Sequence, residues 1–218
     1  MKRMLVFAVA GIMSILAVQT RAEVASSAVK ADIQKKLALA IATSNERSAA
    51  SWQATLDTLS VPTPATFEEL RAIAKKSAMK QCNDEAVAER IADKVVAGRC
   101  LYGMDGKYVR EGFELAKTIG NMVHACGYAE RFKDELGLTN DQVFQLTLDA
   151  LKSTLGKPGY VRIRLQRLPL MKPQKLDDAG MLKELRELNQ IYTGLMTKDE
   201  ENWKPIVVII RTMMDSYK

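Results

Sequence analysis

The sequence predicts a mainly α-helical protein: an antiparallel bundle of about six or seven helices after an N-terminal secretory signal peptide. Apolar residues recur at steps of three and four over most of the chain, which is the periodicity of one helix face. Ser, Thr, Asp and Asn stand where these runs begin and Gly where several end, as helix caps do. Strand-like alternation is confined to one short segment, residues 161–165.

The N-terminus has the organisation of a secretory signal peptide. Lys2 and Arg3 precede an uninterrupted run of apolar or small residues, 4–18, and a small residue stands at the expected cleavage point. The run is shorter than the about 20 residues that span a bilayer, so we favour a cleaved signal over a membrane anchor. Residues 1–22 are therefore predicted to be removed. This leaves 23–218 as a single exported domain, periplasmic or secreted, with no transmembrane span.

Removal of this signal lowers the net charge of the chain. The full sequence has a formal charge of +6, and the predicted signal holds three cations and no acid, so the mature part carries 6 − 3 = +3. Such a small excess does not favour binding to the phosphate backbone of nucleic acid. Export points the same way, and we exclude that class of partner.

The first predicted helices cover residues 27–59. A polar patch at 43–48 is either a break between two helices or a solvated part of one long helix. Two prolines end this stretch, because each disfavours helix in the residue before it. Thr66 with Glu69 then has the spacing of a capping box, which opens a helix over 67–81.

Two longer helices are expected next. Asn83 is a suitable cap for a helix over 84–98, with Gly98 at its end. After a turn-rich stretch, a helix over 108–126 shows one apolar face and is closed by Gly127.

Glycine and capping patterns place the remaining helices. A short helix stops at Gly137, and Thr139 with Gln142 repeats the capping-box spacing ahead of another apolar face. Asp177 or Asp178 is expected to cap a later helix.

Two segments are ambiguous between strand and helix. Apolar and polar residues alternate in 161–165, which is strand periodicity. The β-branched run 206–210 follows Pro205 and fits a buried strand or a helix with Pro in its first turn. The two segments could pair as a small two-stranded ribbon. We favour a helix for 206–210, because Ile206 and Ile210 share a helical face with later apolar residues.

Geometry selects one pairing among the three cysteines of the mature chain. Cys82 and Cys100 bracket the predicted helix 84–98, whose length is about 22 Å, whereas a disulfide needs Cα atoms about 4.4–6.8 Å apart. If the neighbouring helices run up, down and up, Cys82 meets Cys126, and we predict a disulfide between these two. Cys100 is left as the free thiol, which we expect to be buried and unreactive. An intermolecular disulfide and a reactive thiol are the alternatives.

No pattern of residues predicts catalysis, a metal or a cofactor. The chain has one histidine, His124, and Cys126 lies two residues later, so in a helix the two side chains do not face each other. The spacing of a zinc site is absent, and so are the glycine-rich and nucleophile motifs of common enzymes. A pair of carboxylates in glycan hydrolysis is the main enzymatic alternative.

The most uneven feature of the sequence is a basic segment, residues 157–175, which contains three prolines and no acid. Its six cations are Lys157, Arg162, Arg164, Arg167, Lys172 and Lys175. The segment is interleaved with apolar residues, which predicts an extended arm with one cationic and one apolar side. Such an arm suits an anionic, partly apolar target. In the alternative reading it crosses the bundle, with its arginines paired to acidic helix faces.

These observations favour a non-catalytic role. We expect an exported binding or assembly protein of a bacterial cell envelope, which engages a protein partner or an anionic envelope component through the basic arm. Three alternatives belong to other classes: a carrier of an apolar small ligand in a helical cavity, an envelope glycan hydrolase, and a secreted toxin or effector.

Overall fold

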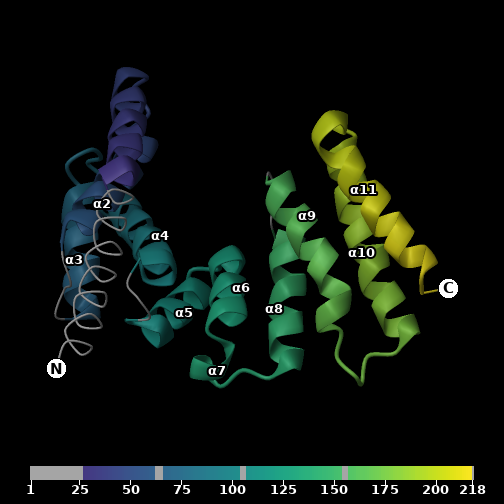
Figure 1. The fold of residues 1–218 in the computed structure, drawn as a ribbon. Coiled ribbons are helices and arrows are strands. Elements are labelled where there is room, and N and C mark those ends of the chain that lie inside the picture. Colours follow the sequence, from purple (N-terminus) through teal and green to yellow (C-terminus); the bar gives the residue numbers. More distant parts are fainter. Residues whose placement is uncertain (1–26, 62–65, 104–106, 154–156, 218) are drawn as a thin grey trace, which may run out of the picture. The chain divides into compact units, whose positions relative to one another are not determined.

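A computed structural model describes residues 27–61, 66–103, 107–153 and 157–217 of the chain. These residues are almost entirely helical and include no strand (Figure 1), which confirms the predicted mainly α fold. None of the described helices is both long and apolar enough to cross a membrane. The predicted signal peptide lies outside the described residues.

The chain divides into two compact units between Arg99 and Cys100. The first contains a helix over residues 27–42, followed by α2 (Glu46–Ser60) and α3 (Phe67–Ala78).

The polar patch in the first stretch is a true break between helices. Ser44 adopts a positive φ of 52°, and the Asn45 side chain accepts a hydrogen bond from the Ser48 amide at 3.1 Å. Asn45 therefore caps α2, because its carboxamide oxygen satisfies one of the amides left without a partner in the first turn.

The predicted capping box of α3 is confirmed. The Thr66 amide donates to the Glu69 carboxylate and the Glu69 amide to the Thr66 hydroxyl, each at 3.1 Å. The next helix, α4 (Glu85–Gly103), differs from prediction at both ends. Its first turn is capped by Asp84, which accepts from the Val87 amide, and not by Asn83.

Gly98 does not end α4. Buried apolar residues stand on both sides of it, Val96 and Ala97 before and Cys100 and Leu101 after. Glycine inside a helix costs only about 1 kcal/mol relative to alanine, less than the burial of this apolar face contributes.

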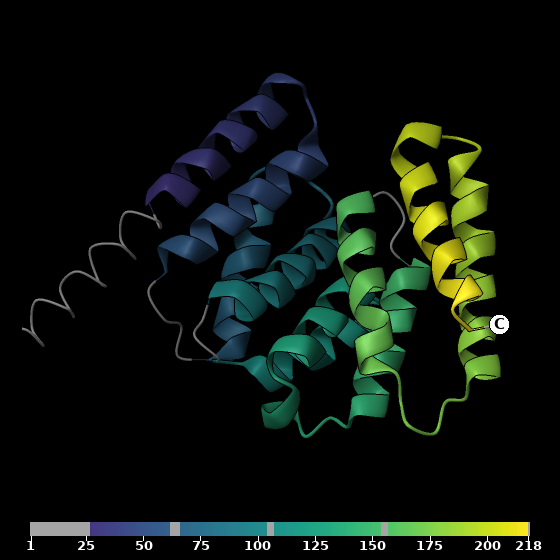
Figure 2. The same ribbon diagram turned by 45° about the vertical axis from the view of Figure 1, so that its right-hand side comes forward.

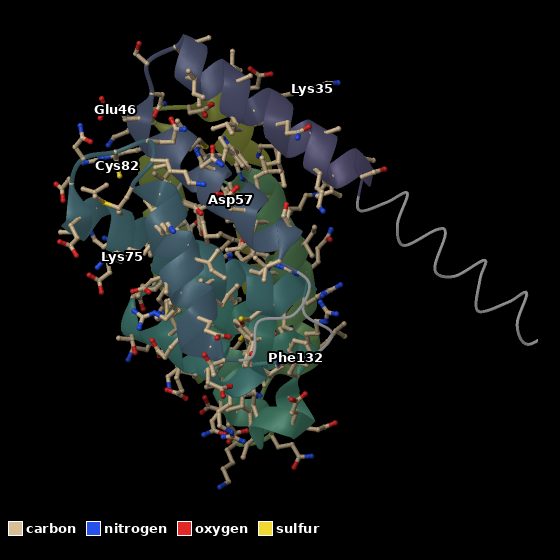
Figure 3. The ribbon with its side chains drawn as sticks, turned by 90° about the vertical axis from the view of Figure 1, so that its left-hand side faces the viewer. Lys35, Glu46, Asp57, Lys75, Cys82 and Phe132 are labelled. Atoms are coloured by element: carbon tan, nitrogen blue, oxygen red, sulfur yellow. The ribbon has the colours of Figure 1, made fainter. Side chains whose placement is uncertain are left out.

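The core of the first unit is built largely from small side chains. Such residues let helix backbones approach closely. The alanines buried there are Ala40, Ala49, Ala50, Ala54, Ala74, Ala78, Ala88, Ala92 and Ala97. Asp57, labelled in Figure 3, accepts hydrogen bonds from Lys80 at 2.8 Å and Gln53 at 3.0 Å. Burial acts to raise the pKa of Asp57, but hydrogen bonds from Lys80, Ser77 and Gln53 outweigh it and the pKa is lowered.

The second unit begins with two helices where one was predicted over 108–126. Helices α5 (Val109–Thr118) and α6 (Met122–Arg131) are separated at Gly120, whose φ is 67°. Asn121 then caps α6 by accepting from the His124 amide at 3.3 Å. A glycine able to adopt positive φ, followed by a capping residue, reverses the chain here without steric strain.

The following turn agrees with prediction. Helix α7 (Lys133–Leu136) ends at Gly137, which has a φ of 69°. Helix α8 (Asn140–Ser153) opens with the predicted capping box, in which the Thr139 amide donates to Gln142 at 2.8 Å and the Gln142 amide donates to the Thr139 hydroxyl at 3.2 Å.

The last four elements are α9 (Pro158–Arg167), the 3-10 helix η1 (Leu168–Met171), α10 (Asp178–Met196) and α11 (Glu200–Asp215). Asp177 caps α10, as one of the two predicted alternatives requires.

Both ambiguous segments are helical. The run 206–210 lies within α11, as favoured, but Pro205 is inside that helix and not in its first turn. Residues 161–165 lie within α9, so the strand periodicity was misleading and the described residues contain no ribbon. The reason is that Arg164 points inward beside Val161 and Leu165, which gives a buried face with helical spacing.

Helices α8 to α11 enclose the main apolar core of the second unit. They run up, down, up and down, and α10 and α11 form a hairpin (Figures 1 and 2). The buried residues of this core are Phe144, Leu148, Leu151, Val161, Leu165, Leu168, Met181, Leu185, Leu188, Tyr192, Trp203, Ile206, Val207 and Ile210. The Tyr192 hydroxyl donates to the Leu151 carbonyl, which ties α10 to α8. This core holds α9, and with it most of the basic segment, in a fixed position.

Candidate functional site

The basic segment folds as α9, η1 and a turn leading to α10, so it is not the extended arm that the sequence suggested. Pro158 occupies the first position of α9. Proline is tolerated there because an amide hydrogen at this position would make no hydrogen bond within the helix. Lys157 is exposed directly before it.

One face of α9 is open to solvent. Successive residues of a helix are about 100° apart, so Arg162, Ile163, Gln166 and Arg167 share a face opposite the buried Val161, Leu165 and Leu168. All four are exposed, and Ile163 retains 51 % of its surface. The cationic and apolar side chains therefore lie on the same side of the segment and not on opposite sides.

Arg164 is not on this face. It retains 9 % of its surface, and its Nε donates to Cys126 Sγ at 3.2 Å. Its Nη2 donates to Glu130 Oε2 at 3.3 Å, and its guanidinium lies 3.6 Å from the centre of the Tyr160 ring. The arginine thus joins α9 to α6 from inside, and it pairs with an acid of a neighbouring helix, as the alternative interpretation of the segment describes.

Cys126 lies at the centre of this buried cluster. Its Sγ also lies 3.5 Å from the Thr147 hydroxyl of α8. Burial raises the pKa of the Cys126 thiol, and the neighbouring Arg164 opposes that shift without reversing it. The raised pKa keeps this thiol protonated at neutral pH, and the thiolate is the reactive form of cysteine.

The predicted disulfide is absent from the structure. Cys82, Cys100 and Cys126 are all buried, and none of them is disulfide-bonded. The geometric premise was wrong, because the segment 108–126 is two helices and not one. Cys126 therefore lies in the middle of α6, packed against Arg164, and not at the end of a long helix.

The remaining two cations of the segment differ from each other. Lys172 forms an ion pair with Asp178, and its Nζ lies 5.2 Å from the centre of the Tyr217 ring. Lys175 is exposed and lines a pocket of about 470 Å³ between the turn and the start of α8. Leu170, 86 % exposed, stands at the same pocket.

Arg167 has an intermediate position. Its side chain is 59 % exposed, and its Nη1 lies 3.8 Å from Glu130 Oε2. A contact of this length at the surface contributes at most about 1 kcal/mol, so Arg167 can exchange it for an anionic group on another molecule.

Four of the predicted residues are therefore exposed at the surface: Lys157, Arg162, Arg167 and Lys175. With the exposed Ile163 and Leu170, they make up what we call the basic face. Within the described residues, no group of three or more His, Cys, Asp or Glu side chains is placed to hold a metal ion.

The sequence did not single out Glu130 or Tyr160 as neighbours of Arg164, or Thr147 as a neighbour of Cys126. Two signals were present: Glu130 is four residues after Cys126, and Tyr160 is four residues before Arg164. Both are helical spacings, but the second is visible only once residues 158–167 are taken as a helix.

Comparison of the chain with protein-family models, with curated proteins and with solved structures finds no match.

Proposed function

We propose that the protein is an exported, non-catalytic binding or assembly protein of a bacterial cell envelope, and that its basic face engages an anionic protein partner or envelope component. The observation that supports this most directly is the exposure of Arg162 and Arg167 beside Ile163, on a segment that carries no acid.

The charges of the basic face are available to a partner. Among the described residues, Arg162 and Lys175 form no ion pair, and Arg167 has the single long contact with Glu130. An exposed apolar side chain beside an unpaired cation and a weakly paired one suits a target with both acidic and apolar groups.

The rigidity of α9 also favours binding. Val161, Leu165 and Leu168 anchor it in the core, and Arg164 fixes it to α6. A surface held in one conformation loses little conformational entropy when a partner docks.

The test is affinity capture from the cell envelope with the mature protein and the Arg162→Ala/Arg167→Ala double variant. The matched control is Lys183→Ala/Lys204→Ala, which removes the same charge from exposed positions of α10 and α11. We expect wild type and control to retain the same partner and the arginine variant to lose it. The affinity of the purified partner for wild type should then fall more steeply with salt concentration than its affinity for the arginine variant. The variant has lost charge contacts that salt would screen.

Equal capture by all three proteins would refute the basic face as the binding surface. Arg164 is left unchanged in this experiment, because its substitution would disturb the fold.

A further inference from the structure

The exposed side of α9 continues into η1 as one surface. Arg167 and Leu168 both keep right-handed helical backbone angles, so the chain passes from α9 into η1 without a break. Ile163 and Leu170 are seven residues apart, which places them on the same side of the helix axis, about two turns from each other. Both are exposed, Ile163 at 51 % and Leu170 at 86 % of their surface. We call this surface the α9 ridge, and it consists of Arg162, Ile163, Gln166, Arg167 and Leu170.

The two apolar side chains of the α9 ridge are not parts of one shared pocket. Leu170 borders the pocket of about 470 Å³, but Arg162, Ile163 and Arg167 do not line it. A leucine that keeps most of its surface exposed makes few contacts with its own fold and protrudes toward whatever lies outside. The interfacial region of a lipid bilayer receives such side chains without a cavity of matching shape.

The charge beside these apolar residues is positive on balance. Helix α9 has three arginines and no acid. Glu130 of α6 pairs with Arg164 at 3.3 Å and more loosely with Arg167 at 3.8 Å. The three arginines and this carboxylate therefore sum to 3 − 1 = +2. Arg162 and Arg167 carry this excess at the surface, where it complements the negative potential of anionic lipids.

The chemistry of arginine suits phosphate headgroups in particular. A guanidinium can donate two parallel hydrogen bonds to phosphate oxygens, while the aliphatic part of the side chain lies along apolar groups. On the α9 ridge, Arg162 directly precedes Ile163, and Arg167 lies between Ile163 and Leu170 along the axis. When the two apolar side chains enter the boundary between headgroups and acyl chains, both guanidinium groups can reach the phosphates.

We propose that the α9 ridge binds the surface of a membrane that contains anionic phospholipids, with Ile163 and Leu170 among the lipids and Arg162 and Arg167 on their phosphates. This inference rests on the proposed function, because it names the anionic envelope component that the basic face engages. The buried Arg164 holds α9 with this side outward. A protein partner is a weaker candidate, because protein interfaces hold their apolar anchors in fitted pockets.

The experiment measures the binding of the intact mature protein to vesicles by flotation. Vesicles of an equal mixture of phosphatidylglycerol and phosphatidylcholine are compared with vesicles of phosphatidylcholine alone. We expect the protein to bind the anionic vesicles, and its affinity to fall with rising salt concentration, because salt screens the attraction between charges. Binding to phosphatidylcholine alone should be at least about tenfold weaker, since each basic residue near an anionic surface contributes to the affinity.

The variants separate the ridge from the rest of the surface. Leu170→Gln should weaken binding to the anionic vesicles about tenfold, because a glutamine gains far less than a leucine on leaving water. Leu39→Gln is the matched control, at a leucine of the first unit that is 65 % exposed, and should leave binding unchanged. Arg162→Ala/Arg167→Ala should also weaken binding about tenfold or more. Leu170 is exposed, so its replacement leaves the core intact.

A fluorescent label reports insertion directly. The three natural cysteines are buried, so an environment-sensitive thiol reagent reacts selectively at the position changed by Leu170→Cys. The emission of this label should rise and shift to shorter wavelength when anionic vesicles are added. The same label introduced by Leu39→Cys should not respond.

The membrane inference and the proposed function can fail separately, because envelope capture and vesicle flotation are different measurements. No binding to anionic vesicles, binding that neither Leu170→Gln nor the arginine double variant weakens, or a silent label at residue 170 on bound vesicles would overturn the membrane inference. A protein partner captured through Arg162 and Arg167, without vesicle binding, would overturn it as well and would uphold the proposed function.

Discussion

Arg164 is the one charged residue that is buried among the described residues. A buried guanidinium is costly unless its donors are satisfied. Here Glu130 supplies the counter-charge, the Cys126 sulfur accepts from Nε, and the Tyr160 ring covers the flat face of the cation. The cluster joins side chains of α6 and α9, and it fixes which of the arginines on α9 remain at the surface.

Loss of the Arg164 side chain is therefore expected to lower the stability of the protein. Arg164→Ala removes the buried counter-charge of Glu130 and the donor to the Cys126 sulfur, and it is expected to lower the free energy of unfolding by about 3 kcal/mol. Urea denaturation monitored by circular dichroism measures this. Arg162→Ala, two residues away and exposed, should change stability by less than about 0.5 kcal/mol. Similar losses for both variants would contradict the buried network.

The Cys126 thiol predicts a pH dependence of stability. Burial raises its folded-state pKa, so the folded protein holds this proton at pH values where the unfolded chain, with a thiol pKa of about 8.5, has lost it. The resulting stabilisation is complete below about pH 8.5 and falls as pH rises toward the folded-state pKa. Cys126→Ala removes the titration, so the stability difference between wild type and this variant should shrink between about pH 8 and pH 10 in denaturation experiments. A constant difference would exclude the linkage.

At the scale of elements, several local signals with a backbone mechanism were read correctly from sequence, but the cap at Asn83 and the stop at Gly98 were not. The capping boxes at Thr66 and Thr139 and the stop at Gly137 are all present. The errors about the basic segment arose because a side chain's direction depends on the tertiary fold. Nothing in the local sequence shows that Arg164 points inward, so the alternation in residues 161–165 resembled that of a strand. For the same reason the basic segment was wrongly predicted to be extended.

Gly120 tests the break between α5 and α6. At a φ of 67° an added Cβ would meet no atom within 4 Å, so Gly120→Ala should destabilise through backbone strain alone, by about 1 kcal/mol. Gly194 lies inside α10, also with open space around it. Gly194→Ala should stabilise the protein by about 0.5–1 kcal/mol. Thermal unfolding of both variants is the measurement, and shifts of the same sign would contradict the assigned conformations.

At the scale of the whole molecule, the helical class was predicted from the sequence, whereas the division into two compact units was not. The division was hidden because it falls inside α4 (Glu85–Gly103) and not in a linker. No proline, glycine-rich stretch or change of composition marks it. Of the candidate site, the six cations were identified, but their separation into surface and interior required the fold.

The two tryptophans of the chain allow each unit to be followed separately. Trp52 lies in the first unit, and Trp203 in the second, where it is packed 5.4 Å from the Tyr192 ring. Leu188→Ala in the core of the second unit should lower the stability reported by Trp203 by about 2–5 kcal/mol and the stability reported by Trp52 by less. Fluorescence-detected denaturation of Trp52→Phe and Trp203→Phe backgrounds gives the two values. Equal losses at both probes would mean that the chain unfolds as one cooperative body.

The course of α4 has a consequence for how this protein can evolve. Domains joined by a loop can be duplicated, lost or fused to other genes without harm to either. Here a gene cut at the boundary would end one product at Arg99, inside a helix, and expose the carbonyl groups of its last complete turn. The other product would begin at Cys100 and Leu101, residues buried in the intact chain. The two units are therefore expected to be inherited together.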